Sequence, residues 1–132
     1  IERLHAEGVE VWVVSSSQQY TVEAMVAHLG VPPERVMGIE LHSTEGGEVG
    51  HDCVRPAPIE EGKRACYLAA HGAPPVAMFG DSRYDLPLME ASGWGVLIDH
   101  DNPEGSEGIN ELRARAEALG AHIIHASLVD PR

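Results

Sequence analysis

Two aspartates four residues apart are the strongest candidates for chemistry in this sequence. Asp81 follows the apolar run Val76–Phe79 and a glycine, and Asp85 comes one helical turn later. If this run is a strand of an open α/β sheet, Asp81 lies at its carboxyl end, where ligands bind, and Asp85 faces the same way. Paired carboxylates there suit Mg²⁺, which prefers oxygen ligands. The structural alternative is that Asp81 or Ser82 caps a helix whose positive end Asp85 complements.

A run of serines ends another apolar segment. Ser15, Ser16 and Ser17 follow Val11–Val14 directly. Serine hydroxyls, together with the backbone N–H groups of the next turn, can bind a phosphate at the start of a helix. Taken alone, the run more commonly caps a following helix, here the one that carries Val22.

A third candidate is Lys63, which stands between Gly62 and Arg64 near the start of a predicted helix over residues 60–71. A lysine at the first turn of a helix is mismatched to the positive end of the helix dipole. The mismatch is tolerable where the ammonium group reaches an anion or a carboxylate. A solvated surface lysine is the usual outcome, so Lys63 indicates anion binding only in combination with the other residues.

The elements that position these residues repeat one pattern: a helical stretch, a glycine, then an apolar strand. The segments Val11–Val14, Val76–Phe79 and Val96–Ile98 are apolar on both faces, which is typical of parallel strands covered by helices. Glycines stand where the predicted helices end: Gly8, Gly30, Gly72 and Gly120. The alternation predicts an α/β fold with a doubly wound parallel sheet.

Residues 36–54 break this pattern. They have the features of two strands around the turn Thr44-Glu45-Gly46-Gly47, so we expect a β-hairpin that projects from the sheet. We assign all of residues 1–132 to one core domain that contains this hairpin. The polar stretch Asp99–Gly108 is expected to be a loop after the strand at residues 96–98.

The composition excludes several classes of function. The chain has 132 residues and is 43% hydrophobic, which is enough for a compact domain with its own core. A net charge of -12 argues against binding to nucleic acid, and the apolar runs are far shorter than the roughly 20 residues of a membrane span. The two cysteines, Cys53 and Cys66, fit a reducing compartment, so we expect a cytoplasmic protein; a single disulfide is the alternative.

The three candidate sites occur in a characteristic order. A strand that ends in Ser15, a helix that carries Lys63, and a strand that runs into Asp81 with Asp85 beyond it resemble motifs two, three and four of the haloacid dehalogenase (HAD) superfamily. The resemblance covers residues 1 to about 100, includes the hairpin, and is strongest for the branch of phosphoserine and phosphocholine phosphatases. It implies a Rossmann-like core and Mg²⁺-dependent hydrolysis of a small-molecule phosphomonoester through an aspartyl-phosphate.

The resemblance also implies a role for each residue. Asp81 would be a magnesium ligand, with Asp85 as its supporting carboxylate in metal binding and catalysis. Ser15 and Ser16 would bind the phosphoryl oxygens. Lys63 would neutralise the phosphate and the attacking carboxylate. Tyr84 is a departure, since phosphoserine phosphatases usually carry asparagine there, and it argues against phosphoserine as the substrate.

A larger departure concerns the family's first motif. No Asp-x-Asp follows an apolar strand at the beginning of this sequence. In the family that motif supplies the nucleophile and an acid/base aspartate, and its strand lies centrally between those ending in Ser15 and Phe79. Without it the sheet would have two exposed edges. We therefore expect the nucleophile, its strand and a substrate-selecting cap to lie in a missing N-terminal segment or another chain, and the 132 residues alone to be inactive.

Two other readings remain open. One is a noncatalytic HAD-like domain used for binding or regulation. The other is a GDSL-type esterase in which Ser82 attacks an ester, although the Asp-x-x-His that such enzymes use does not occur here. The eight histidines suggest no metal cluster, and His122 and His125 are expected to point to opposite faces of a strand.

Overall fold

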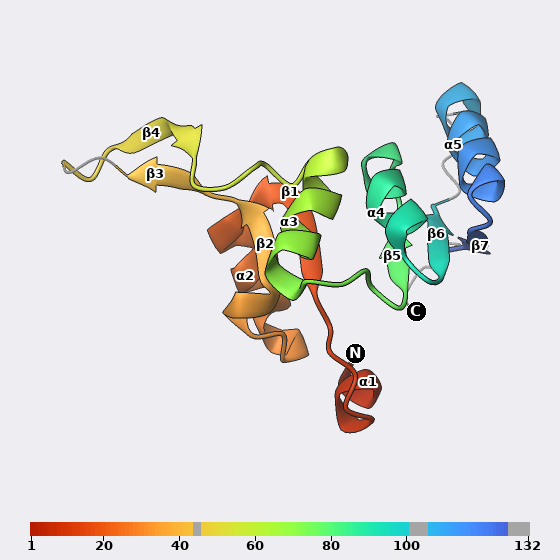
Figure 1. Cartoon of the computed structure of the whole chain (residues 1–132), viewed down its shortest axis with the longest axis horizontal. Helices are drawn as coiled ribbons and strands as arrows, with labels where there is room; N and C mark the ends of the chain where they lie inside the picture. The colour runs from red at the N-terminus through yellow and green to blue at the C-terminus, as the bar shows by residue number, and fades with distance from the viewer. Residues whose placement is uncertain (44–45, 101–105, 127–132) are drawn as a thin grey trace, which may run out of the picture. The chain divides into compact units, whose positions relative to one another are not determined.

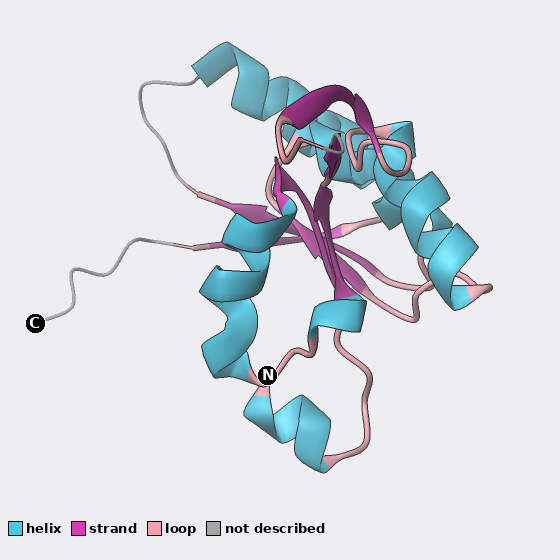
Figure 2. Ribbon diagram, turned by 90° about the vertical axis from the view of Figure 1, so that its left-hand side faces the viewer, coloured by secondary structure: helices cyan, strands magenta, loops and turns pink. Residues whose placement is uncertain are grey.

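The computed structural model describes residues 1–43, 46–100 and 106–126. The chain divides into two compact units, Ile1–Ala70 and His71–Arg132, which are described in turn. Figure 1 labels their helices and strands, and Figure 2 colours them by type. In the described part of the chain, no helix is long and apolar enough to cross a membrane. That the two units form a single domain stays a prediction.

The first unit contains four strands with helices before, between and after them. In chain order its elements are α1 (Glu2–Ala6), β1 (Val13–Gln18), α2 (Gln19–Val26), the 3₁₀ turns η1 (Ala27–Leu29) and η2 (Pro33–Arg35), β2 (Val36–Ile39), β3 (Leu41–Ser43), β4 (Val49–Cys53) and α3 (Glu61–His71).

β1 and β2 form a parallel pair with a helix packed on each face. Val13 pairs with Val36, and both lie in an apolar cluster with Val22 of α2. Trp12, the residue directly before β1, makes an edge-to-face contact with Tyr67 of α3, with 5.7 Å between the ring centroids. Because neighbouring residues of an extended chain point to opposite sides, α2 covers one face of the pair and α3 the other.

The antiparallel hairpin is shorter than the sequence pattern predicts. Val36–Ile39 pairs in parallel with β1 as part of the core, and only β3 and β4 make up the hairpin. Figure 1 shows the hairpin extending away from β2 and α3. The residues of β2 are almost all buried, whereas most of β3 and β4 is exposed. Apolar composition does not distinguish a short buried strand from a hairpin strand, so the sequence pattern places β2 in the hairpin.

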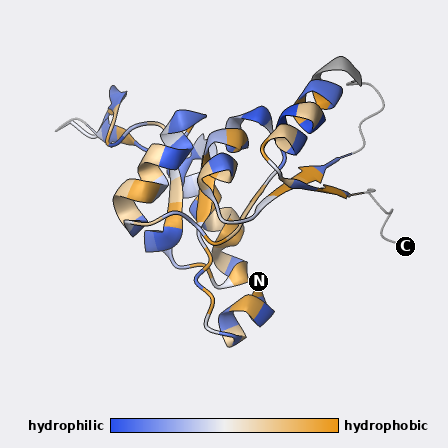
Figure 3. Cartoon of the chain, turned by 45° about the vertical axis from the view of Figure 1, so that its right-hand side comes forward, coloured by the Kyte–Doolittle hydropathy of each residue, from blue (hydrophilic) through white to orange (hydrophobic). Residues whose placement is uncertain are grey.

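The second unit is a parallel three-stranded sheet in the order β5-β6-β7. Its elements are β5 (Met78–Gly80), the 3₁₀ turn η3 (Arg83–Asp85), α4 (Leu86–Ala91), β6 (Gly95–Asp99), α5 (Ser106–Ala118) and β7 (His122–His125). Leu97 of β6 packs against Leu86 and Met89 of α4 and against Ala116 of α5. Figure 3 shows that α5 carries both hydrophilic and hydrophobic residues, as expected for a helix with one face on a core.

The predicted fold class is confirmed, because parallel strands alternate with helices in both units. β1 begins at Val13 and β5 at Met78, each two residues later than predicted. Two further boundaries differ at the carboxyl ends of strands. β1 does not end before the serines but continues through them to Gln18. Asp99 is not in a loop: it is the last residue of β6 and is buried. Both shifts place polar side chains inside strand ends, where a pattern of apolar residues gives no signal.

Candidate active site

The serines at residues 15–17 lie in the irregular part of β1. Val14 is the last regular partner of β2 before Gln18, so three residues of β1 stand opposite one residue of β2, Gly38. Such a bulge bends the strand and redirects its side chains, and bulges are common beside active sites. The serines are therefore presented by a strand end that turns directly into α2, rather than by the first turn of the helix.

Two of these hydroxyl groups make hydrogen bonds within the first unit. The backbone N–H of Ser17 donates to Oγ of Ser15 at 3.1 Å, which leaves the Ser15 hydroxyl proton as a donor for a ligand. Ser16 Oγ donates to the carbonyl oxygen of Pro58 at 3.0 Å. The Ser16 hydroxyl can thus serve a phosphate only as an acceptor, and its visible role is to tie β1 to the segment before α3.

The segment that contains Pro58 leads into α3 and places Lys63 in its first turn. A Cβ on Gly62 would lie 1.9 Å from the carbonyl oxygen of Ala57, so only glycine permits the chain to enter α3 along this path. Lys63 follows in the first turn of the helix and is only 7% exposed. Through the bond from Ser16 to Pro58, the structure joins the serines to the segment that leads into Lys63.

In the second unit, the turn after β5 is built around Asp85. Oδ2 of Asp85 accepts hydrogen bonds from the backbone N–H groups of Asp81 (3.2 Å) and Ser82 (3.0 Å) and from Ser82 Oγ (2.7 Å). With Ser82 as N-cap this is a capping box, so the structural alternative for these two residues is realised. A Cβ on Gly80 would lie 2.5 Å from Cβ of Asp85, which explains the glycine before Asp81.

Asp81 differs from Asp85 in its surroundings. Its side chain is 60% exposed, and Oδ2 lies 3.4 Å from Nε2 of His100, which follows β6. Mg²⁺ in proteins is bound by one or two carboxylates, with phosphate oxygens and waters as its other ligands. An outward-facing carboxylate at the carboxyl end of a parallel strand fits such a ligand. Among the described residues, no group of three or more His, Cys, Asp or Glu side chains is arranged to hold a metal ion by itself.

A buried carboxylate in the same unit, Asp99, is paired with two partly or largely exposed side chains, and no sequence motif predicts it. The side chain of Asp99 is 3% exposed, and its Oδ2 lies 2.5 Å from Nη2 of Arg113 and 3.1 Å from Nδ1 of His125. Asp99-His100-Asp101 is the one Asp-x-Asp in the sequence, and Asp101 lies outside the described residues. Because the Asp99 carboxylate is buried and paired, it is not available to attack a phosphate ester. The available signal was its position directly after an apolar run.

A cavity of about 400 Å³ in the first unit is not lined by the serines or by Lys63. Gln19, Arg55 and Cys66 are among its lining residues. Burial raises the pKa of the Cys66 thiol, and the Arg55 guanidinium opposes this rise to a smaller extent. Both cysteines are free, so the disulfide alternative is not realised. A buried, protonated thiol is a poor nucleophile, and we do not place the phosphate site in this cavity.

Comparison with known proteins adds the family. A family model described as haloacid dehalogenase-like hydrolase matches residues 1–90, which include the serines, Lys63, Asp81 and Asp85. The chain belongs to this family. No curated protein matches the sequence. Membership in the HAD family argues against the GDSL-type esterase interpretation of Ser82, whose hydroxyl also donates to Asp85 in the capping box.

Two solved structures are similar to this HAD-family chain. One is a conserved functionally unknown protein from Anaerococcus prevotii DSM 20548, with a TM-score of 0.73 and 21% identity, over 92% of this chain and 35% of that chain. The other is a phosphoserine phosphohydrolase-like protein from Francisella tularensis subsp. tularensis SCHU S4, with a TM-score of 0.62 and 17% identity, over 89% of this chain and 58% of that one. At these identities the likeness shows the fold. The chain spans between about a third and three-fifths of the length of these two proteins.

Proposed function

We propose that this chain is part of a Mg²⁺-dependent hydrolase of small-molecule phosphomonoesters. The observation that carries the proposal is the turn after β5, where Gly80 and the buried Asp85 hold the backbone so that Asp81 faces outward at the carboxyl end of a parallel strand. This is the place where ligands gather in open α/β sheets. The match to the HAD hydrolase family supports it.

Each of these side chains has a different role in binding the phosphoryl group. The Ser15 hydroxyl donates to a phosphoryl oxygen, and the ammonium group of Lys63 neutralises charge on the phosphate and on the attacking carboxylate. Because Lys63 is buried, its charge acts through a medium of lower effective dielectric than water. Asp81 would hold the metal, and Asp85 orients the turn. Bound Mg²⁺ would neutralise charge on the transferred group and fix its position.

The nucleophile is proposed to come from outside these 132 residues, in an Asp-x-Asp that forms an aspartyl-phosphate. Asp99 is buried in an ion pair and does not serve. Among the described strands, β1 pairs with β2 alone and β5 with β6 alone, so each has an edge to which a further strand can pair. That strand can belong to the same polypeptide or to another chain. The 132 residues alone are then expected to show no turnover.

A noncatalytic HAD-like binding or regulatory domain is the second candidate. The observation that favours it is that Ser16, Ser82 and Asp85 all make bonds that stabilise the fold whether or not a phosphate binds.

A panel of phosphate monoesters separates the two candidates. The full-length protein is assayed with Mg²⁺ and with excess chelator, and we expect turnover of at least one small ester that requires Mg²⁺ and is inhibited by inorganic phosphate. Absence of turnover across the panel would favour the noncatalytic candidate. Because Tyr84 departs from the phosphoserine pattern, the panel includes sugar, amino-alcohol and nucleoside monophosphates beside phosphoserine.

A further inference from the structure

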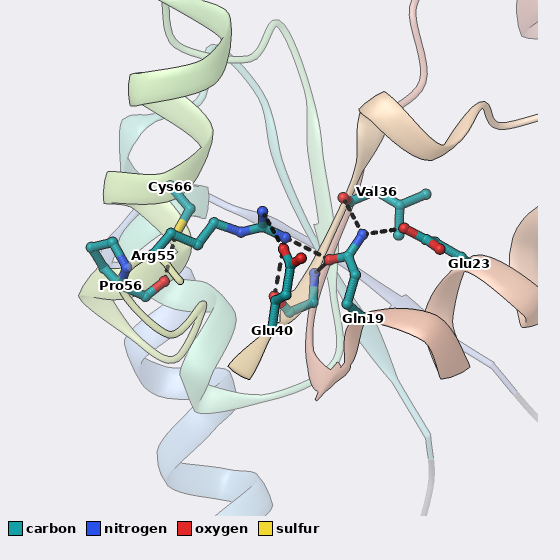
Figure 4. Close-up of polar contacts among 8 residues, drawn as sticks. Gln19, Glu23, Val36, Glu40, Arg55, Pro56 and Cys66 are labelled. Carbon is teal, nitrogen blue, oxygen red and sulfur yellow. Dashed lines mark hydrogen bonds and ion pairs between the residues drawn. The ribbon is translucent and has the colours of Figure 1, made fainter. Parts of the chain in front are cut away.

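Gln19, the first residue of α2, anchors the turn that follows the serines. Its amide nitrogen donates to the carbonyl of Val36 at 3.0 Å and to Oε1 of Glu23 at 2.6 Å. Its amide oxygen accepts from the N–H of Gly38 and from Nη2 of Arg55, both at 2.6 Å (Figure 4). A side-chain amide has two N–H donors and two acceptor positions, so these four bonds use its whole capacity.

The residue is also buried, with 6% of its surface exposed. Removing the amide would therefore leave its partners, including the backbone groups of β2, without water to replace it. A group that is buried and fully bonded has nothing left to offer a ligand. Gln19 acts on the serines through the backbone that it holds, rather than by touching a substrate.

β2 passes directly against this turn at Gly38. A Cβ there would lie 2.6 Å from Cα of Gln19 and 2.8 Å from the carbonyl oxygen of Ser17. These are backbone atoms, which cannot move aside without moving the turn. Gly38 thus lets β2 come close enough for its N–H to reach the amide oxygen of Gln19, and the two contacts together fix where β1 ends.

Arg55 extends this network to the base of the hairpin. Glu40 lies just before β3 and Arg55 just after β4, and Nη1 of Arg55 donates to Oε2 of Glu40 at 3.2 Å. The N–H of Val54 also donates to the carbonyl of Glu40, at 2.8 Å. The guanidinium group therefore connects the two ends of the hairpin to the amide oxygen of Gln19 (Figure 4).

We propose that Gln19 and Arg55 are positioning residues for phosphate binding, which couple the hairpin base to the serine turn. The inference rests on the proposed phosphatase function and adds to it two side chains that no motif marks. Phosphoryl oxygens must meet the Ser15 hydroxyl within hydrogen-bond distance. A misplacement of about 1 Å can cost on the order of 100-fold in rate, so the residues that hold the turn affect turnover without contacting the substrate.

The test compares Gln19→Ala, Arg55→Ala and Arg55→Lys in the full-length protein. Steady-state kinetics give kcat and KM, the inhibition constant of inorganic phosphate reports on phosphate binding, and thermal unfolding reports on stability. Arg35→Ala is the matched control, because Arg35 also pairs with a glutamate, Glu10, at 2.9 Å, and its side chain is 30% exposed against 33% for Arg55.

We expect both alanine variants to raise the inhibition constant of phosphate by about tenfold or more. Misplacing the Ser15 hydroxyl would weaken its hydrogen bond to the charged phosphate, and loss of one such bond can produce a change of this size. Arg55→Lys should recover part of the lost phosphate affinity, because lysine keeps the charge but not the bidentate geometry of the guanidinium group. Arg35→Ala should leave the constant at the wild-type value. Measurements are made at a temperature where every variant is folded. If Gln19→Ala does not fold, the comparison of Arg55→Ala with Arg55→Lys tests the proposal.

Arg55 variants that unfold at a lower temperature but keep the wild-type kcat, KM and phosphate inhibition would show a purely structural network, and would overturn this inference alone. A wild-type protein without Mg²⁺-dependent phosphatase activity would instead overturn the proposed function, and this inference with it.

Discussion

Asp81 and Asp85 have the same side chain and stand one helical turn apart, yet their environments separate their roles. Asp85 is 4% exposed and uses one oxygen to accept three hydrogen bonds from the turn that follows β5. Asp81 faces solvent. The sequence presents them as a pair of ligands, whereas the contacts make Asp85 the residue that shapes the turn and leave Asp81 as the exposed carboxylate that a cation can reach.

Lys63 allows a test at the same scale. Replacing Lys63 with alanine should lower kcat by about 100-fold or more, because a preorganised charge is lost where negative charge accumulates in the transition state. The neighbouring Arg64→Ala is the control: Arg64 is 42% exposed and forms a surface pair with Glu61 at 3.7 Å. Such exposed ion pairs contribute little to stability. Steady-state kinetics of both variants check this, and a Lys63→Ala enzyme within tenfold of wild type would contradict the role given to Lys63.

At the scale of elements, the sequence is informative where a pattern is local. The helix at residues 61–71, the strand before Asp81 and the capping role of Ser82 all follow from apolar periodicity and from the residues that start helices. The bulge that presents Ser15–Ser17 was not predictable, because it depends on the register with β2. Gln19 and Arg55 are 36 residues apart, and neither carries a local sign of their contact.

The sheet of the second unit provides a prediction about stability. Leu97 is 1% exposed and packs against α4 and α5, so Leu97→Ala should lower the free energy of unfolding by about 2–5 kcal/mol. Leu119→Ala is the control, since Leu119 belongs to the same unit and is 39% exposed. Chemical denaturation monitored by circular dichroism measures both. A Leu97→Ala variant as stable as Leu119→Ala would show that the core is placed incorrectly.

At the scale of the whole molecule, each of the two units contains residues with a proposed role. The first supplies the serine turn and Lys63, and the second supplies Asp81. The net charge of -12 repels a phosphate ester at long range, so the proposed binding requires a local cation such as Lys63 together with a metal ion. The nucleophile is proposed to lie beyond this sequence, which fits a chain that spans 35% and 58% of two similar structures.

The most direct test of this account is the Mg²⁺ dependence of turnover in the full-length protein when Asp81 is replaced. The control is Asp52→Ala, which removes the same charge from an exposed position on β4. We predict that Asp81→Ala brings Mg²⁺-dependent phosphatase turnover down to background, while Asp52→Ala keeps the activity and Mg²⁺ requirement of the wild type. An Asp81→Ala protein that still hydrolyses its phosphate ester with the wild-type dependence on Mg²⁺ would contradict the assignment of this site.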